Sequence, residues 1–259
     1  MTSLKKNKNI AEIKGLSKSF GDIVAVRDVD LNIKKESIVG LVGPNGSGKT
    51  TLLKMICALI NPTKGKIKVL GYNGLKDNKD IHKNIGYIPQ EDSLYNDLTV
   101  LDNLLFFSKL FDVDDKTFEK NSKKLFNALG IDQVLNRIIG ELSGGWKRRV
   151  AIACSLLHDP LFIVLDEPTV GLDTHIRSEL WQFFKDLQRE GKTILMTTHY
   201  LQEAENCDYV AIMHKGEIVA FGTPSELIKK TKKVKLKDNI KRSRFDDVYL
   251  SLTKKEKTK

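Results

Sequence analysis

The sequence predicts an α/β fold, in which a mainly parallel sheet is covered by helices and a helical subdomain is inserted into it. Three features of the 259-residue chain lead to this prediction. β-like stretches and a glycine-rich turn come first, and apolar residues at helical spacing run from about Leu98 to Pro160. Strands then alternate with helices to about Lys230, a pattern typical of a parallel sheet with helices on its faces.

The expected elements follow one another in order. β-like stretches lie at Asp22–Val26 and Ser37–Val42, and a helix is expected over Lys49–Leu59, directly after the glycine-rich turn. A further β-like segment lies at Lys66–Val69, and the apolar run Phe162–Leu165 has the length of a buried strand. We expect one domain over residues 1–230, with the helical subdomain at about 95–160, and a short basic tail over residues 231–259.

The composition fits a globular chain with one sizeable core, since 41% of the residues are hydrophobic and 29% are charged. No apolar run approaches the ~18 residues needed to cross a bilayer. The lysine-rich segment Met1–Asn9 has no apolar stretch behind it, so we do not expect a signal peptide. The three cysteines are far apart and lack metal-ligand spacing, which is typical of reduced thiols in a cytosolic protein.

The net charge of +10 is concentrated at the C-terminal end. Residues 229–259 hold thirteen Lys and Arg against four Asp and Glu, a charge of +9, so the rest of the chain is close to neutral. A basic tail can contact anionic lipid head groups or nucleic acid, or it can simply be solvated. We expect no nucleic-acid partner, and a contact of the tail with anionic lipid remains open.

The segment Gly43–Thr50 fits the pattern G-x-x-x-x-G-K-[ST], follows a β-like run and opens a helix, which is the context of a phosphate-binding loop. Its glycines let backbone N–H groups turn toward phosphate oxygens, and the helix adds its positive dipole end. Lys49 would contact the β- and γ-phosphates of ATP, and the Thr50 hydroxyl would ligate Mg²⁺. The further candidate nucleotide contacts are Gly43, Asn45, Gly46, Ser47, Gly48 and Thr51.

The apolar run Phe162–Leu165 ends in two acids, Asp166 and Glu167. Carboxylates are costly to bury without partners, so their place at the end of a buried strand needs a reason. Asp166 could hold Mg²⁺, directly or through water, and Glu167 could accept a proton from an attacking water. The alternative, that a polar loop simply begins here, becomes weaker beside a phosphate-binding loop.

Between these motifs, Leu142–Trp146 reads Leu-Ser-Gly-Gly-Trp and starts a helical pattern. A serine hydroxyl and glycine N–H groups at a helix N-terminus can bind anions, although a plain helix cap is the simpler interpretation of such a segment. The segment resembles the signature motif of ATP-binding-cassette (ABC) proteins. The chain as a whole, from about Ile10 to Ile228, resembles an ABC transporter ATP-binding subunit.

The resemblance implies a P-loop NTPase core with an antiparallel β-subdomain near the N-terminus and an inserted α-helical subdomain. It also implies that Ser143, Gly144 and Gly145 face the γ-phosphate held by the other chain of an ATP-bound homodimer. Before the phosphate loop, Glu36-Ser37 stands where the family usually has Gly-Glu. In the signature itself Trp146 stands where the family usually has Gln, which would alter contacts around the ribose.

Four further segments resemble family motifs. Gly86–Glu91 resembles the Q-loop, whose Gln90 would sense Mg²⁺ and the attacking water, and Gly171–Asp173 resembles the D-loop, which crosses the dimer interface. Thr197–His199 resembles the switch histidine, and Phe20 takes the place of an aromatic, more often Tyr, that stacks on adenine. The resemblance thus implies catalytic roles for Glu167, His199 and Gln90, Mg²⁺ ligation by Thr50, Gln90 and Asp166, and nucleotide contacts by Phe20 and Asp173.

By this resemblance the chain hydrolyses ATP to power a separate transmembrane permease, which it would contact through Glu91–Asp97. Residues Leu142–Arg149 and Phe245–Leu250 resemble the ABC-2, or daunorubicin-resistance, exporter group, so we expect export of drug-, antibiotic- or lipid-like molecules. The expected location is cytoplasmic, on the inner face of the cell membrane. Two alternatives stay open: transmission of force to a membrane partner without transport, and action on ribosomes or nucleic acid. Ribosome-acting relatives normally carry two cassettes on one chain, and DNA-repair relatives carry long coiled-coil insertions. This chain has one cassette and no long heptad run, which argues against the second alternative.

Overall fold

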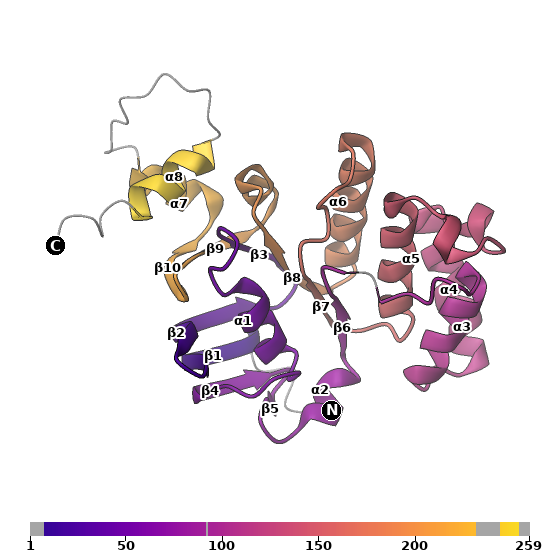
Figure 1. The fold of residues 1–259 in the computed structure, drawn as a ribbon, viewed down its shortest axis with the longest axis horizontal. Coiled ribbons are helices and arrows are strands. Elements are labelled where there is room, and N and C mark those ends of the chain that lie inside the picture. The colour runs from indigo at the N-terminus through magenta and orange to yellow at the C-terminus, as the bar shows by residue number, and fades with distance from the viewer. Residues whose placement is uncertain (1–7, 92, 232–243, 254–259) are drawn as a thin grey trace.

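The computed structural model describes residues 8–91, 93–231 and 244–253 (Figure 1). Within these residues one sheet has the strand order β10-β9-β3-β8-β7-β6, and all its neighbours pair in parallel except β10 with β9. Its strands are β3 (Ile38–Val42), β6 (Ile85–Ile88), β7 (Phe162–Leu165), β8 (Thr193–Thr198), β9 (Tyr209–His214) and β10 (Glu217–Gly222). The prediction of a mainly parallel sheet is confirmed.

Helices cover both faces of this sheet, which is why every residue of its central strands β3, β8 and β7 is buried. In β7, Ile163 and Leu165 belong to one core, with α5 (Gly144–Leu156) and α6 (Thr174–Arg189). Phe162 and Val164 point to the opposite core, with α1 (Lys49–Ile56) and the second sheet. The period of two in strand side chains thus divides one apolar run between two cores.

The second sheet is antiparallel, as expected, and has the order β2-β1-β4-β5 among the described residues. Its strands are β1 (Asn9–Phe20), β2 (Ile23–Lys34), β4 (Lys64–Val69) and β5 (Tyr72–Asn73). A two-residue turn at Gly21 and Asp22 joins β1 to β2, and Gly21 has a φ of 56°, which glycine adopts without strain. This turn places Phe20 and Ile23 side by side as partners at the end of the hairpin.

The predicted helical middle consists of α3 (Val100–Leu110), α4 (Asp115–Leu129) and α5, which lie together on the side of the molecule away from the antiparallel sheet (Figure 1). Thr99 starts α3 in a capping box, accepting the Asp102 N–H at 3.1 Å. Asp114 caps α4 by accepting the Thr117 N–H at 3.0 Å, and Gly130, with a φ of 65°, ends the helix. A short helix, α2 (Asn78–His82), precedes β6.

Helix α1 is shorter than predicted, because Ile56 ends it and Ala58 takes a positive φ of 54°. The C-terminal stretch differs more. Helices α7 (Pro224–Thr231) and α8 (Arg244–Thr253) end the described chain, and Phe245 and Val248 are fully buried in the core that contains α5 and α6. Of the alternatives left open for the basic tail, simple solvation therefore does not describe residues 244–253.

A count of basic residues does not indicate this helix, because the count ignores the spacing of apolar residues. The apolar face of the helix consists of Phe245, Val248 and Tyr249 at helical spacing. The Tyr249 hydroxyl lies 2.7 Å from His214 Nδ1, at the end of β9. Residues 232–243 and 254–259 of the predicted tail lie outside the described residues, and so does the predicted lipid contact. Among the described residues, none of the helices is both long enough and apolar enough to span a membrane.

Candidate nucleotide-binding site

The phosphate loop connects the end of β3 to the start of α1 and is packed tightly against its neighbours. A Cβ atom on Gly43 would lie 2.3 Å from the Met213 carbonyl oxygen, and one on Gly48 would lie 2.3 Å from the Ala25 carbonyl oxygen. Gly48 also has a φ of 101°, a conformation that side-chain-bearing residues rarely adopt. The Gly216 N–H, in the turn between β9 and β10, donates to the Ser47 carbonyl at 3.0 Å. Only glycine fits at both positions, which explains the spacing of the motif.

Two side chains of the loop show what it is built to hold. The Ser47 hydroxyl is buried and has no hydrogen-bond partner among the described residues, although buried polar atoms are nearly always paired. The Lys49 ammonium is buried, donates to the Gly43 carbonyl at 2.8 Å and to the Pro44 carbonyl at 3.1 Å, and lies 3.8 Å from Glu167 Oε1. Burial lowers the pKa of Lys49, while Glu167 and Asp166 act to raise it. A phosphate would supply the missing partner and the compensating charge.

The acids after β7 are hydrogen-bonded to Thr197 of the neighbouring strand β8. Asp166 is 1% exposed and accepts the Thr197 hydroxyl at 2.5 Å, and the same Thr197 oxygen accepts the Glu167 N–H at 2.8 Å. Glu167 has a φ of 48°, in the left-handed region that residues other than glycine seldom occupy. Its backbone is thus held in an unusual conformation at the mouth of the phosphate loop.

The Glu167 carboxylate is the point where separate elements meet. Gln90, after β6, donates to Glu167 Oε2 at 3.4 Å, and His199 Nδ1, after β8, lies 3.2 Å from the same oxygen. Lys49, at the start of α1, approaches the other oxygen. A carboxylate fixed in this way can take a proton from a water placed beside it. The structure therefore brings together Glu167, His199 and Gln90, for which the family resemblance implies catalytic roles.

One shallow hollow contains this cluster and the end of the β1–β2 hairpin. Phe20, 51% exposed, Ile23 and Val24 form its apolar side. The polar side is lined by Asn45, Gly46, Gly48, Lys49, Thr50, Thr51, Gln90 and Glu167. An exposed ring next to a phosphate loop is suited to stacking on a planar base. The Lys18 ammonium lies 5.0 Å from the centre of the Phe20 ring.

Part of the predicted site does not join this hollow. Ser143 is exposed at the start of α5 and its side chain makes no capping hydrogen bond, while Gly144 is equally exposed. Gly145 packs against α6, where a Cβ atom would lie 2.7 Å from Ile176 Cδ1. Asp173 caps α6 by accepting the Ile176 N–H at 3.0 Å. Within one chain, the signature segment and Asp173 are thus separate from the phosphate loop.

The sequence reasoning missed Arg148, which ties the signature helix to the site. Its buried guanidinium donates to the Pro89 carbonyl at 2.7 Å and to the Asp166 and Pro168 carbonyls at 3.0 Å each. These carbonyls belong to the loops that carry Gln90 and Glu167. The sequence offered neighbouring basic residues with no means of choosing among them, because the partners are backbone atoms distant along the chain.

Comparison with known proteins agrees with this geometry. The family model described as ABC transporter matches residues 26–170. The chain belongs to the ABC transporter family. This ABC chain is 38% identical over 218 residues to the probable multidrug ABC transporter ATP-binding protein YbhF of Escherichia coli, a match that covers 84% of the chain but 38% of that relative. It is equally similar to Nod factor export ATP-binding protein I of Rhizobium etli, covering 84% of the chain and 69% of the relative.

Solved structures extend the likeness to the fold of the ABC chain. An ATP-binding subunit of an ABC transporter superposes with a TM-score of 0.83 at 28% identity, covering 94% of this chain and 99% of that one. The ATP-binding cassette MJ0796, in a dimeric post-hydrolysis state bound to ADP and phosphate, gives a TM-score of 0.74 at 28% identity, covering 82% and 98%. The hollow described above therefore belongs to an ABC ATP-binding domain.

Proposed function

We propose that this chain hydrolyses ATP in the presence of Mg²⁺ and so drives a separate transmembrane permease that exports its substrate. The observation that carries the proposal is the convergence of Lys49, Gln90 and His199 on Glu167 beside a phosphate loop. This set combines a phosphate-binding cation with a carboxylate base and the polar groups that orient it.

In this proposal each side chain has one task. Glu167 accepts the proton of the attacking water, and Gln90 and His199 hold that water and the γ-phosphate in place. Lys49 keeps its ammonium against the β- and γ-phosphates of ATP. Thr50, Asp166 and Gln90 are the residues that would hold Mg²⁺, which when bound would neutralise charge on the phosphates. The buried Asp166, fixed by Thr197, has the oxygen chemistry that this ion prefers.

We further propose that two copies of the chain close on two ATP molecules. The exposed N-terminus of α5, with the uncommitted Ser143 hydroxyl, would then face the γ-phosphate bound by the other copy. Asp173 and the rest of the D-loop would lie at that interface. The dimeric form of the similar cassette MJ0796 supports this arrangement.

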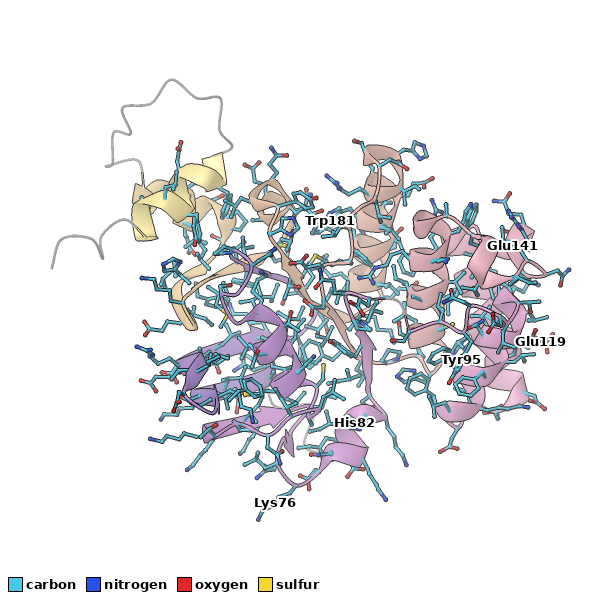
Figure 2. All side chains as sticks on the ribbon, in the orientation of Figure 1. Lys76, His82, Tyr95, Glu119, Glu141 and Trp181 are labelled. Atoms are coloured by element: carbon cyan, nitrogen blue, oxygen red, sulfur yellow. The ribbon has the colours of Figure 1, made fainter. Side chains whose placement is uncertain are left out.

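The permease would dock on exposed apolar side chains of the helical subdomain. These are Tyr95, Leu98, Leu105, Phe106 and Leu110, referred to here as the α3 patch. Tyr95 (Figure 2) belongs to the predicted contact segment Glu91–Asp97. Its ring packs edge-to-face on Phe106, with the two ring centroids 4.7 Å apart. Docking there would place the chain at the inner face of the cell membrane. The name of the Rhizobium etli relative, Nod factor export ATP-binding protein I, supports export as the direction.

The test is affinity purification of the full chain from detergent-solubilised membranes of its native host. We expect a membrane protein in stoichiometric amount, and faster ATP hydrolysis by the complex than by the chain alone. Phe106→Glu should lose that partner, whereas Leu59→Glu, which changes an exposed leucine outside the α3 patch, should keep it. Ribosomal proteins or nucleic acid in place of a membrane protein would overturn the transport proposal and leave the ATPase proposal intact.

A further inference from the structure

Glu203 is a buried carboxylate that the nucleotide hollow does not contain. It lies on η3 (Leu201–Asn206), a 3₁₀ segment directly after the switch histidine, and is 4% exposed. A buried carboxylate needs hydrogen-bond donors around it, so its partners indicate what it holds.

Each carboxylate oxygen of Glu203 binds a different segment. The Thr198 hydroxyl donates to Oε2 at 2.7 Å, and the Thr169 hydroxyl donates to Oε1 at 2.6 Å. Trp181, on the side of α6 toward the six-stranded sheet (Figure 2), donates its indole N–H to Oε1 at 3.5 Å. Hydrogen bonds from a hydroxyl to a carboxylate are short and strong, so both segments are firmly attached to Glu203.

The two threonines lie next to the switch histidine and next to the D-loop. Thr198 directly precedes His199, and its hydroxyl also accepts the Tyr200 N–H at 3.0 Å, so the backbone on both sides of His199 is fixed. Thr169 lies between Glu167 and the D-loop segment Gly171–Asp173. Glu203 therefore joins the segment that carries the switch histidine to the one that leads from the catalytic base to the D-loop.

Arg177 of α6 makes a second link between the same two segments. It donates to the Leu172 carbonyl at 3.2 Å in the D-loop, and its guanidinium lies 4.9 Å from the centre of the Tyr200 ring. Its Nε is 3.9 Å from Glu203 Oε1, so the second link is adjacent to the first.

We propose that Glu203 is a positioning residue for ATP hydrolysis, which couples the D-loop to His199 through its bonds to Thr169 and Thr198. A displacement of the D-loop then moves His199 as well, because neither can shift without breaking a buried hydrogen bond to the same carboxylate. In the homodimer, contact of the partner with the D-loop would be transmitted in this way to the histidine beside Glu167. This inference rests on the proposed function, and in particular on hydrolysis at Glu167.

The test separates turnover from ATP binding. Thr198→Val and Thr169→Val remove the hydroxyl and keep the shape, and each should lower kcat by about tenfold, the effect expected for a lost hydrogen bond to a charged group. Thr198→Ser and Thr169→Ser keep the hydroxyl and should restore kcat. The KM for ATP should stay within about twofold throughout, because Phe20 and Lys49 are not in this network. Glu203→Gln should resemble the valine variants.

Two controls exclude a general loss of structure. Glu205→Gln changes an exposed carboxylate of the same short segment and should leave kcat unchanged. Phe184→Leu removes buried volume from α6, so it should lower Tm without the selective loss of kcat. Unchanged kcat in the valine variants would overturn the proposal. The proposal would also be overturned if the valine variants lost kcat, the serine variants failed to restore it, and Tm and KM changed in proportion.

Failure of this inference is distinct from failure of the proposed function. If Glu167→Gln abolishes turnover while the valine variants and Glu203→Gln hydrolyse ATP normally, only the coupling role of Glu203 is lost. Normal turnover in Glu167→Gln would instead remove the assignment of the hydrolytic site itself.

Discussion

The two parts of the predicted nucleotide site differ in how far a single chain completes them. Around Glu167, the buried Lys49, the half-buried His199 and the exposed Gln90 all contact one buried carboxylate, and they come from elements far apart in the sequence. Around Ser143, the side chain and its glycine neighbour are exposed, and the start of α5 has no side-chain cap. One chain thus assembles the hydrolytic part, and it leaves an anion-binding helix terminus available to another molecule.

The largest effect should come from Glu167→Gln, which keeps the shape of the assembled part and removes its base. We expect turnover to fall by about 1,000-fold while MgATP still binds, because Lys49 and the phosphate loop are untouched. The variant should accumulate as an ATP-bound dimer. Steady-state ATPase assays and size-exclusion chromatography with ATP check this, with Glu205→Gln as the matched control. Near-normal turnover would show that Glu167 is not the base.

A smaller loss should follow Ser143→Arg, which blocks the exposed terminus of α5. If that terminus acts on the partner's ATP, turnover should fall by about 100-fold and the ATP-dependent dimer should disappear. Binding of ATP to the monomer should remain within about twofold, because Ser143 does not line the hollow. Titration with a fluorescent ATP analogue measures this binding. A large loss of monomer affinity would contradict the comparison, since it would place Ser143 in the site of its own chain.

The smallest effect should come from Arg148→Met, which removes the hydrogen bonds between the signature helix and the loops of Gln90 and Glu167, and it is expected in stability. Three carbonyl groups lose a charged donor, so the free energy of unfolding should fall by about 3 kcal/mol, measured by urea denaturation. Lys147→Met, at the neighbouring half-buried position, should change it by less than about 0.5 kcal/mol. Equal stability of the two variants would show that the carbonyl bonds of Arg148 do not hold the parts together.

Local patterns were enough to predict much of this molecule. The phosphate loop could be recognised because tight packing at Gly43 and Gly48 permits only glycine, and such a requirement is visible in sequence. The acids at the end of β7 stand out because charge seldom follows a buried strand directly. By contrast, α8 was not recognised in a lysine-rich stretch, because its burial depends on packing against α7, η3 and β10. Arg148 and Glu203 were missed because their partners lie 18 or more residues away, except for Thr198.

The sequence by itself determined the fold class, the family and the residues of the phosphate loop, since each depends on spacing along the chain. Only the tertiary structure decided which of these residues meet. It placed Gln90, His199 and Lys49 on one carboxylate, and it kept Ser143 and Asp173 apart from them. The physical reason is that parallel strands bring their carboxyl ends to one edge of the sheet, while α5 begins in the inserted helical subdomain.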